Sequence, residues 1–165
     1  EAGKIVIKGE IGTIELRGDN VFTGYWEMPE KTAESFRDDG FFITGDMARE
    51  DEDGYITIVG RDKDLIISGG LNIYPKEIES LIDAHHGVTE SAVIGVPHPD
   101  FGEGVVAILV ADDNVTADAV MAGISDKLAK FKQPKKILFV DALPRNTMGK
   151  VQKAVMRKEH EKMFS

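Results

Sequence analysis

The chain has 165 residues, of which 42% are hydrophobic and 30% are charged, so it can bury one ordinary core or two small ones. It has no cysteine, which excludes disulfides, a thiol nucleophile and cysteine-ligated metal, and its four histidines show no metal-ligand spacing. A net charge of −9 argues against general nucleic-acid binding.

The first part of the chain is typical of a β-rich unit. Alternating apolar positions predict two strands, at Lys4–Lys8 and at Gly12–Arg17. A short helix is expected over Pro29–Phe36, because proline suits a first helical turn. The segments FFITGDMARE and YITIVGR predict a hairpin in which Asp53-Gly54 supplies the turn.

Beyond Gly60 strands and helices mix. The segments LIIS and LNIY flank a turn at Gly69-Gly70, Pro75 opens a helix, and SAVIGV and VVAILV predict a strand pair. Thr116 is the N-cap of an expected amphipathic helix that extends to about Phe131. The stripe of this helix that faces the core is expected to hold Val120, Ile124, Leu128 and Phe131.

The last segments predict a strand at KILFV, a loop at DALPRNTMGK and a closing helix at VQKAVMRKEHEKM. The fold class predicted from all these elements is α+β. We expect a β-rich piece over residues 1–62 and an α+β domain over residues 63–165.

Charge is unevenly distributed between the two ends. Residues 1–125 hold 9 Lys and Arg against 25 Asp and Glu, whereas residues 126–165 hold 11 against 4. This basic tail is either a solvated helix face or a surface that meets the phosphates of a small anionic ligand, and composition leaves both open.

Asp46 and Arg61 are the first candidate site residues. Thr44-Gly45-Asp46 is expected to end a strand, where the glycine lets a ligand approach the backbone and the Asp46 carboxylate can accept hydrogen bonds from a vicinal diol such as ribose. Arg61 follows the partner strand of the same hairpin, so both side chains are expected on one rim. The residues alone leave two alternatives, a ribose-binding pair or a structural salt bridge.

Lys150 is the second candidate, expected at the tip of a glycine-containing loop just ahead of a helix. A mobile ammonium there suits a phosphate or carboxylate, and the plain alternative is a solvated surface lysine. The turn at Gly69-Gly70 either lines a narrow passage or simply reverses the chain. Neither a G-x-S-x-G nucleophile elbow nor a Walker-type loop occurs in the sequence.

Six segments in a fixed order carry a family resemblance: GEIGTIELRGDNVFTGYW, PEKT, FFITGD, GRDKDLIISGGLNIYPKEIE, FKQPKK and LPRNTMGKVQK. Together they resemble the C-terminal third of the acyl-adenylate-forming family, which holds acyl-CoA synthetases, luciferases and peptide-synthetase adenylation domains. The resemblance covers nearly the whole chain from Gly9 and is strongest to malonyl-CoA synthetases. It implies a mobile C-terminal α+β lid domain, a β-rich remnant of the N-terminal domain before it, and a hinge near Lys63.

The resemblance also implies an ATP-dependent acid:CoA ligase reaction through an acyl-AMP. Lys150 would be catalytic, Asp46 and Arg61 would bind the ribose of ATP, and Gly69 and Gly70 would line the pantetheine tunnel. Three further residues would contact the nucleotide of CoA, namely Phe101, Phe131 and Lys135. Gln133 departs from the basic residue that relatives have at its position.

The implied partners are malonate or a related acid, ATP, CoA, Mg²⁺ bound through ATP, and a protein acetyltransferase acting on Lys150. Because the family's phosphate loop and acyl pocket lie in the N-terminal domain, we expect this chain alone to be inactive. No apolar run reaches the roughly 18 residues that cross a bilayer, so a cytoplasmic location is expected. Three alternatives stay open: another acyl-CoA synthetase, a module that loads a carrier protein, and an inactive fragment that docks a partner through residues 126–165.

Overall fold

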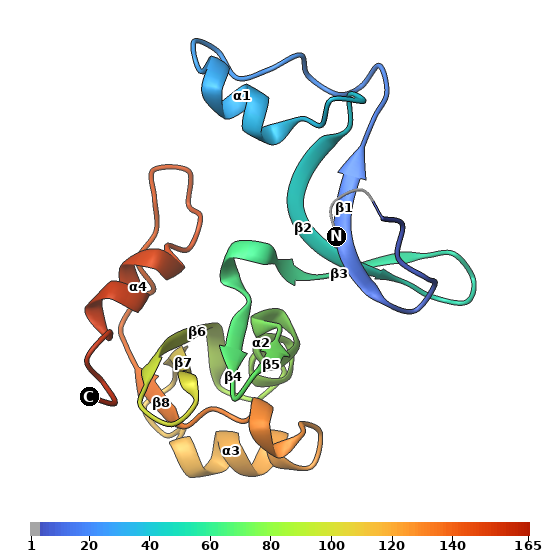
Figure 1. The fold of residues 1–165 in the computed structure, drawn as a ribbon. Coiled ribbons are helices and arrows are strands. Elements are labelled where there is room, and N and C mark those ends of the chain that lie inside the picture. The colour runs from blue at the N-terminus through green and yellow to red at the C-terminus, as the bar shows by residue number, and fades with distance from the viewer. Residues whose placement is uncertain (1–3) are drawn as a thin grey trace. The chain divides into compact units, whose positions relative to one another are not determined.

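The computed structural model describes residues 4–165, which divide into two compact units at the Lys63–Asp64 bond. We call Glu1–Lys63 unit 1 and Asp64–Ser165 unit 2, and describe each by itself. The elements of unit 1 are β1 (Ile11–Leu16), α1 (Pro29–Ser35), β2 (Phe42–Glu50) and β3 (Ile56–Arg61), and the short 3₁₀ turn η1 (Asp62–Asp64) crosses the division (Figure 1).

Unit 1 is built on a three-stranded antiparallel sheet in the order β1-β2-β3. The predicted β2–β3 hairpin is confirmed. In its turn the Asp51 carboxylate accepts hydrogen bonds from the backbone amides of Asp53 (3.0 Å) and Tyr55 (2.9 Å). Gly54 takes a φ of 89°, a left-handed conformation that costs glycine little.

The predicted strand at Lys4–Lys8 is wrong, since β1 begins only at Ile11. The alternating residues Ile5 and Ile7 are 94% and 72% exposed. An apolar alternation specifies a strand through burial of one face and pairing with a neighbour, and the described residues give this segment neither a buried face nor a strand partner.

Side-chain contacts near the surface hold unit 1 together. Four aromatic rings pack at centroid distances of 5.0 to 5.6 Å, from Phe22, Tyr25, Phe36 and Phe42. The Arg37 guanidinium meets the Glu15 carboxylate in a two-point ion pair of 2.6 and 2.7 Å, and the hydrogen bond to this carboxylate raises the pKa of Arg37. Within residues 4–63, Ala48 is the single buried apolar residue.

In chain order the elements of unit 2 are β4 (Ile66–Ser68), β5 (Leu71–Ile73), α2 (Pro75–Asp83), β6 (Val88–His98), β7 (Gly102–Ala111), α3 (Ala117–Ser125), η2 (Lys130–Lys132), β8 (Lys136–Phe139) and α4 (Lys153–Glu159). Its strands form a five-stranded mixed sheet in the order β5-β4-β7-β6, with β8 parallel to β7. The centre of the sheet is the long hairpin of β6 and β7, paired from Val88 with Ala111 to His98 with Gly102.

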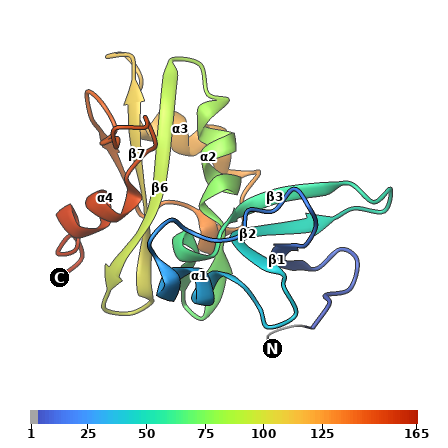
Figure 2. The ribbon, with the colours of Figure 1, turned by 90° about the horizontal axis from the view of Figure 1, so that it is seen from above.

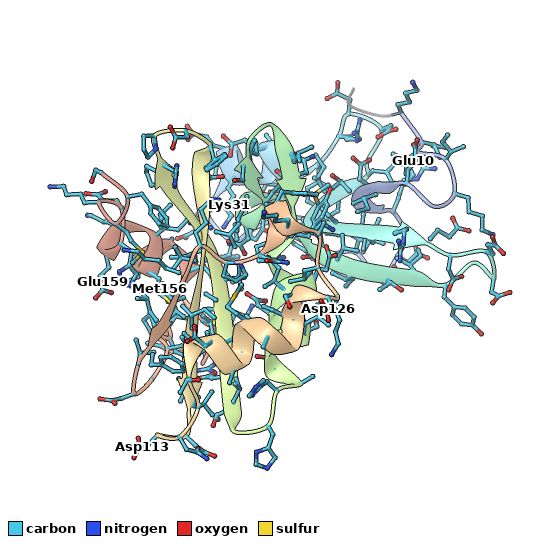
Figure 3. The ribbon with its side chains drawn as sticks, turned by 90° about the horizontal axis from the view of Figure 1, so that it is seen from below. Glu10, Lys31, Asp113, Asp126, Met156 and Glu159 are labelled. Carbon is cyan, nitrogen blue, oxygen red and sulfur yellow. The ribbon has the colours of Figure 1, made fainter. Side chains whose placement is uncertain are left out.

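Both faces of this central hairpin are covered, so β6 and β7 are apolar on both sides. Alternate residues such as Val93 and Leu109 pack with α2 and α3, and the others pack with α4 and the segment before it (Figure 2). Met156 of α4 is 1% exposed and lies in the apolar cluster on the α4 side of the hairpin (Figure 3). The predicted mixed α and β composition of this part of the chain is confirmed.

Helix α3 is shorter than predicted. It ends at Ser125, because the Gln133 side chain donates hydrogen bonds to the carbonyl oxygens of Ser125 (3.0 Å) and Leu128 (3.2 Å) and so satisfies them without a further helical turn. Three of the four stripe residues are buried as expected, Val120, Ile124 and Leu128. The fourth, Phe131, falls in η2 and is 41% exposed.

Helix α4 is tied to the rest of unit 2 by two ion pairs. Arg157 meets Asp64, the first residue of the unit, at 3.0 Å, and Lys153 meets Glu79 of α2 at 2.5 Å. Glu79 is 7% exposed and also accepts a hydrogen bond from the amide of Val93 at 2.8 Å. The buried carboxylate is therefore fully engaged, as a buried charge has to be.

The end of the chain packs on the sheet. Phe164 lies over Gly104 of β7, where an added Cβ would come within 2.6 Å of the ring, so this close approach requires glycine. None of the helices in the described chain is both long and apolar enough to span a membrane. The same residues hold no His, Asp and Glu cluster suited to a metal ion.

Candidate functional site

Asp46 and Arg61 form an ion pair in unit 1. Asp46 lies within β2, which continues to Glu50, and not at the end of a strand as expected. It stands opposite Arg61 in the β2–β3 register, and Arg61 Nε lies 2.6 Å from Asp46 Oδ1. The strand is shaped locally by Gly45, at φ 72°, and by Thr44, whose hydroxyl accepts from the Asp46 amide at 3.0 Å. Both side chains are partly exposed, so the pair is accessible to a ligand, and a carboxylate can accept hydrogen bonds.

Lys150 lies at the end of a tight turn between β8 and α4, not at its tip. The turn is closed by Asn146, whose amide donates to the Lys150 carbonyl at 3.0 Å and whose side-chain oxygen accepts from the Lys150 amide at 2.9 Å. Gly149 takes a φ of 76°. The Lys150 side chain is exposed, and within residues 4–165 its ammonium makes no hydrogen bond or ion pair, so it is available to a ligand.

The glycine turn between β4 and β5 lies beside an aromatic ring. Gly69 and Gly70 both adopt positive φ, at 60° and 77°, which allows the two-residue reversal. The Gly69 amide donates to the carbonyl of Phe101 at 2.8 Å, and Gly69 faces the Phe101 ring. The exposed turn and the ring thus form one surface.

Lys135 completes that surface. Its Nζ lies 4.0 Å from the centroid of the Phe101 ring, which is a cation–π contact. The backbone of Lys135 is fixed by a hydrogen bond from its amide to the carbonyl of Val105 at 2.8 Å. A flat apolar ring beside an ammonium can take a heterocyclic base and a phosphate.

Phe131 is not joined to this surface by any ring or hydrogen-bond contact among the described residues. Its neighbour Lys132 pairs with Glu77 at 2.7 Å, which neutralises that ammonium. Gln133, the position that lacks a basic residue, points its amide at the end of α3 and is engaged there. The structure therefore gathers Gly69, Phe101 and Lys135, and among the described residues Phe131 shows no ring or hydrogen-bond contact with these three.

One residue in contact with Phe101, His98, has no role assigned from the sequence. The His98 ring lies 4.8 Å from that of Phe101 and 4.8 Å from that of Phe164. The signal in the sequence is that His98 and Phe101 share one short segment around the β6–β7 turn.

Lys63, the expected hinge, is an exposed residue of η1 and the last residue of unit 1.

The match to a known family falls on unit 2. Residues 77–150 match the AMP-binding enzyme C-terminal domain. Lys150 is the last residue of the matched range. The fold of this unit is the small mixed α/β C-terminal domain of the adenylate-forming fold.

Relatives of known structure and name agree with this match. The crystal structure of ATP-bound MatB from Rhodopseudomonas palustris is 60% identical, covers 100% of the chain and has a TM-score of 0.90. A 3-[(3aS,4S,7aS)-7a-methyl-1,5-dioxo-octahydro-1H-inden-4-yl]propanoyl:CoA ligase of Rhodococcus jostii is 48% identical over 92% of the chain. The long-chain-fatty-acid–CoA ligase FadD13 of Mycobacterium tuberculosis is 45% identical over 90%. The chain spans 30% of each of these two ligases and 33% of the MatB chain, about a third of each relative.

Proposed function

Because the chain carries the AMP-binding enzyme C-terminal domain and is homologous to acyl-CoA ligases, we propose that it is the C-terminal part of an AMP-forming acid:CoA ligase. The whole enzyme converts a carboxylate and ATP to an acyl-AMP and pyrophosphate, and then transfers the acyl group to the thiol of CoA with release of AMP. The observation that carries the proposal is the likeness of the whole chain to ATP-bound MatB. This likeness and the resemblance to malonyl-CoA synthetases favour malonate as the acid.

Lys150 is proposed to act in the first half-reaction. Negative charge accumulates around the α-phosphate as the carboxylate oxygen attacks phosphorus, and a nearby ammonium stabilises it. The exposed side chain on a braced turn supports this role, because the turn fixes the backbone while the long side chain reaches outward. Acetylation of Lys150 by a protein acetyltransferase would remove the charge and stop this step.

Asp46 and Arg61 are proposed to hold the ribose of ATP. The Asp46 carboxylate is partly exposed and can accept from a ribose hydroxyl, while Arg61, bound at Oδ1, orients it. Mg²⁺ is proposed to enter with the ATP phosphates, bound by the N-terminal domain of the whole enzyme. The described residues offer no carboxylate cluster of their own for it.

The surface of Gly69, Gly70, Phe101 and Lys135 is proposed to meet CoA in the second half-reaction. The two glycines leave room for the pantetheine arm, the ring can stack on the base and the ammonium can meet a phosphate. Phe131 is the remaining proposed contact of CoA, and among the described residues no ring or hydrogen-bond contact joins it to that surface. Lys63 is proposed as the hinge at which unit 2 rotates between the half-reactions.

Rapid-quench measurement of acyl-AMP and acyl-CoA in the complete enzyme tests the proposal. Lys150→Ala should abolish acyl-AMP formation from ATP and malonate yet still convert supplied malonyl-AMP and CoA to the thioester. Gly69→Leu should do the reverse, because a side chain there obstructs the path of the thiol. Lys158→Ala, which removes an exposed α4 lysine outside the site, is the matched control and should behave like the wild type.

The outcome against the proposal is specific. If Lys150→Ala and Gly69→Leu lose the same half-reaction, or if Lys150→Ala makes acyl-AMP at the rate of the control, the assigned roles are wrong. Acyl-AMP formation followed by transfer to a carrier-protein thiol and not to CoA would indicate a loading module.

A further inference from the structure

The turn that carries Lys150 is rigid within itself. The Asn146 side chain accepts hydrogen bonds from the amides of Met148 (3.0 Å) and Lys150 (2.9 Å), and the Gly149 amide donates to the Asn146 carbonyl at 2.9 Å. These bonds set the shape of the turn. They do not by themselves fix its position relative to the sheet, because all the partners belong to the turn.

Arg145 supplies that second connection. Its Nη1 donates to the carbonyl of Gly149 at 2.6 Å, and its Nη2 donates to the carboxylate of Glu90. Glu90 belongs to β6 and stands opposite Val110 of β7, near the end of the β6–β7 ladder where β6 begins. The guanidinium therefore bridges the sheet and the peptide group directly before Lys150. A planar fork with fixed donors suits such a two-sided contact, whereas a lysine ammonium does not.

The other side of the turn is anchored by different contacts. The Gln152 amide donates to the Pro144 carbonyl at 2.8 Å, and α4 is held by Met156 in the core and by Lys153 at Glu79. None of these contacts reaches Gly149. Gly149, at φ 76°, is also the residue of the turn with the most backbone freedom. A hydrogen bond to its carbonyl therefore has the greatest effect on the position of Lys150.

We infer that Arg145, held by Glu90, is a positioning residue that sets the Lys150 ammonium for acyl-AMP formation. The inference rests on the proposed role of Lys150. In this role Arg145 acts by fixing the Gly149–Lys150 peptide and not by contact with a reactant. Since a displacement of about 1 Å from a distant change can cost about 100-fold in rate, loss of this brace should slow adenylation strongly while the rest of the unit stays folded.

The experiment uses the complete enzyme. Arg145→Ala should lower the kcat of acyl-AMP formation by about 100-fold with little change in the KM for ATP, and should leave conversion of supplied malonyl-AMP and CoA unchanged. Glu90→Gln keeps the bond to Gly149 and weakens only the anchor, so a smaller loss of about 10-fold is expected. If Arg145→Ala does not fold, Glu90→Gln still decides, because an unchanged adenylation rate would overturn the inference.

The exchanged pair Glu90→Arg/Arg145→Glu separates positioning from simple stability. It restores an ion pair between the two positions but leaves no donor for the Gly149 carbonyl. We expect the Tm to recover relative to that of Arg145→Ala, while the rate of adenylation stays low. Amide hydrogen exchange at Met148 and Lys150 should be faster than in the wild type. Full recovery of adenylation in this variant would show that the pair is only structural and would overturn the inference.

Lys150→Ala measured in parallel distinguishes this inference from the proposed function. If Lys150→Ala loses adenylation and Arg145→Ala keeps it, only the positioning role fails. If Lys150→Ala keeps adenylation, the proposed function of the turn fails first.

Discussion

Unit 2 contains two buried apolar clusters, whereas unit 1 over residues 4–63 contains a single buried apolar residue, Ala48. Unit 1 instead exposes large apolar side chains, among them Trp26 at 87% and Ile56 at 64%. Unit 2 therefore has the core of an independent domain. Unit 1 has strands, a helix and polar side-chain contacts, but it buries too little apolar surface to fold independently. This fits the proposal that it is the end of a larger domain.

The largest expected effect comes from separating the two units. Residues 64–165 expressed alone should unfold cooperatively, because both clusters lie within them. Residues 1–63 expressed alone should show no cooperative transition, since they bury almost no apolar side chain. Urea unfolding followed by circular dichroism measures both, and a cooperative transition in the shorter piece would break the comparison.

Two substitutions that shorten an apolar side chain to alanine compare the two units at single residues. Leu109→Ala, at a fully buried position of β7, should lower the free energy of unfolding by about 2–5 kcal/mol, through lost burial and a new cavity. Ile58→Ala, at a position of β3 that is 57% exposed, should change it by less than about 0.5 kcal/mol. Native-state hydrogen exchange on the whole chain measures the free energy of unfolding of each unit separately. Equal losses of this free energy in the two variants would mean that unit 1 has a core of its own.

The smallest effect concerns aromatic rings of equal exposure. Phe22 in unit 1 and Phe131 in unit 2 are both 41% exposed, but Phe22 contacts three other rings. Phe22→Leu should destabilise unit 1 by about 1 kcal/mol, because leucine keeps most of the apolar area and loses the ring pairs. Phe131→Leu is the control and should leave stability nearly unchanged. Amide hydrogen exchange in β2 measures the stability change in Phe22→Leu, and exchange in α3 measures the change in Phe131→Leu.

The local elements of this fold could be predicted because their signals are local. The turn at Asp53-Gly54, the pair Gly69-Gly70 and the proline at position 75 each fix backbone geometry within a few residues. The failed predictions depend on distant partners. Lys4–Lys8 alternates like a strand but is not buried, and α3 stops where Gln133 reaches back to it.

The candidate site follows the same rule. The pairing of Asp46 with Arg61 could be expected from one hairpin, and the two do pair at 2.6 Å. The ion pair between Glu90 and Arg145 joins residues 55 positions apart in the sequence, and no local pattern predicts it. Sequence therefore indicated which residues carry the chemistry, whereas the residues that hold them required the folded sheet.

The ring of Phe164 over Gly104 gives this chain a natural place for an optical reporter. Trp26 is the only tryptophan in the sequence, and it is exposed in unit 1. A Trp26→Phe/Phe164→Trp variant would move the single indole beside His98, which in turn contacts Phe101. Its fluorescence would then respond to events at the Phe101 and Lys135 surface, so arrival of a nucleotide there could be timed in a stopped-flow instrument without a label.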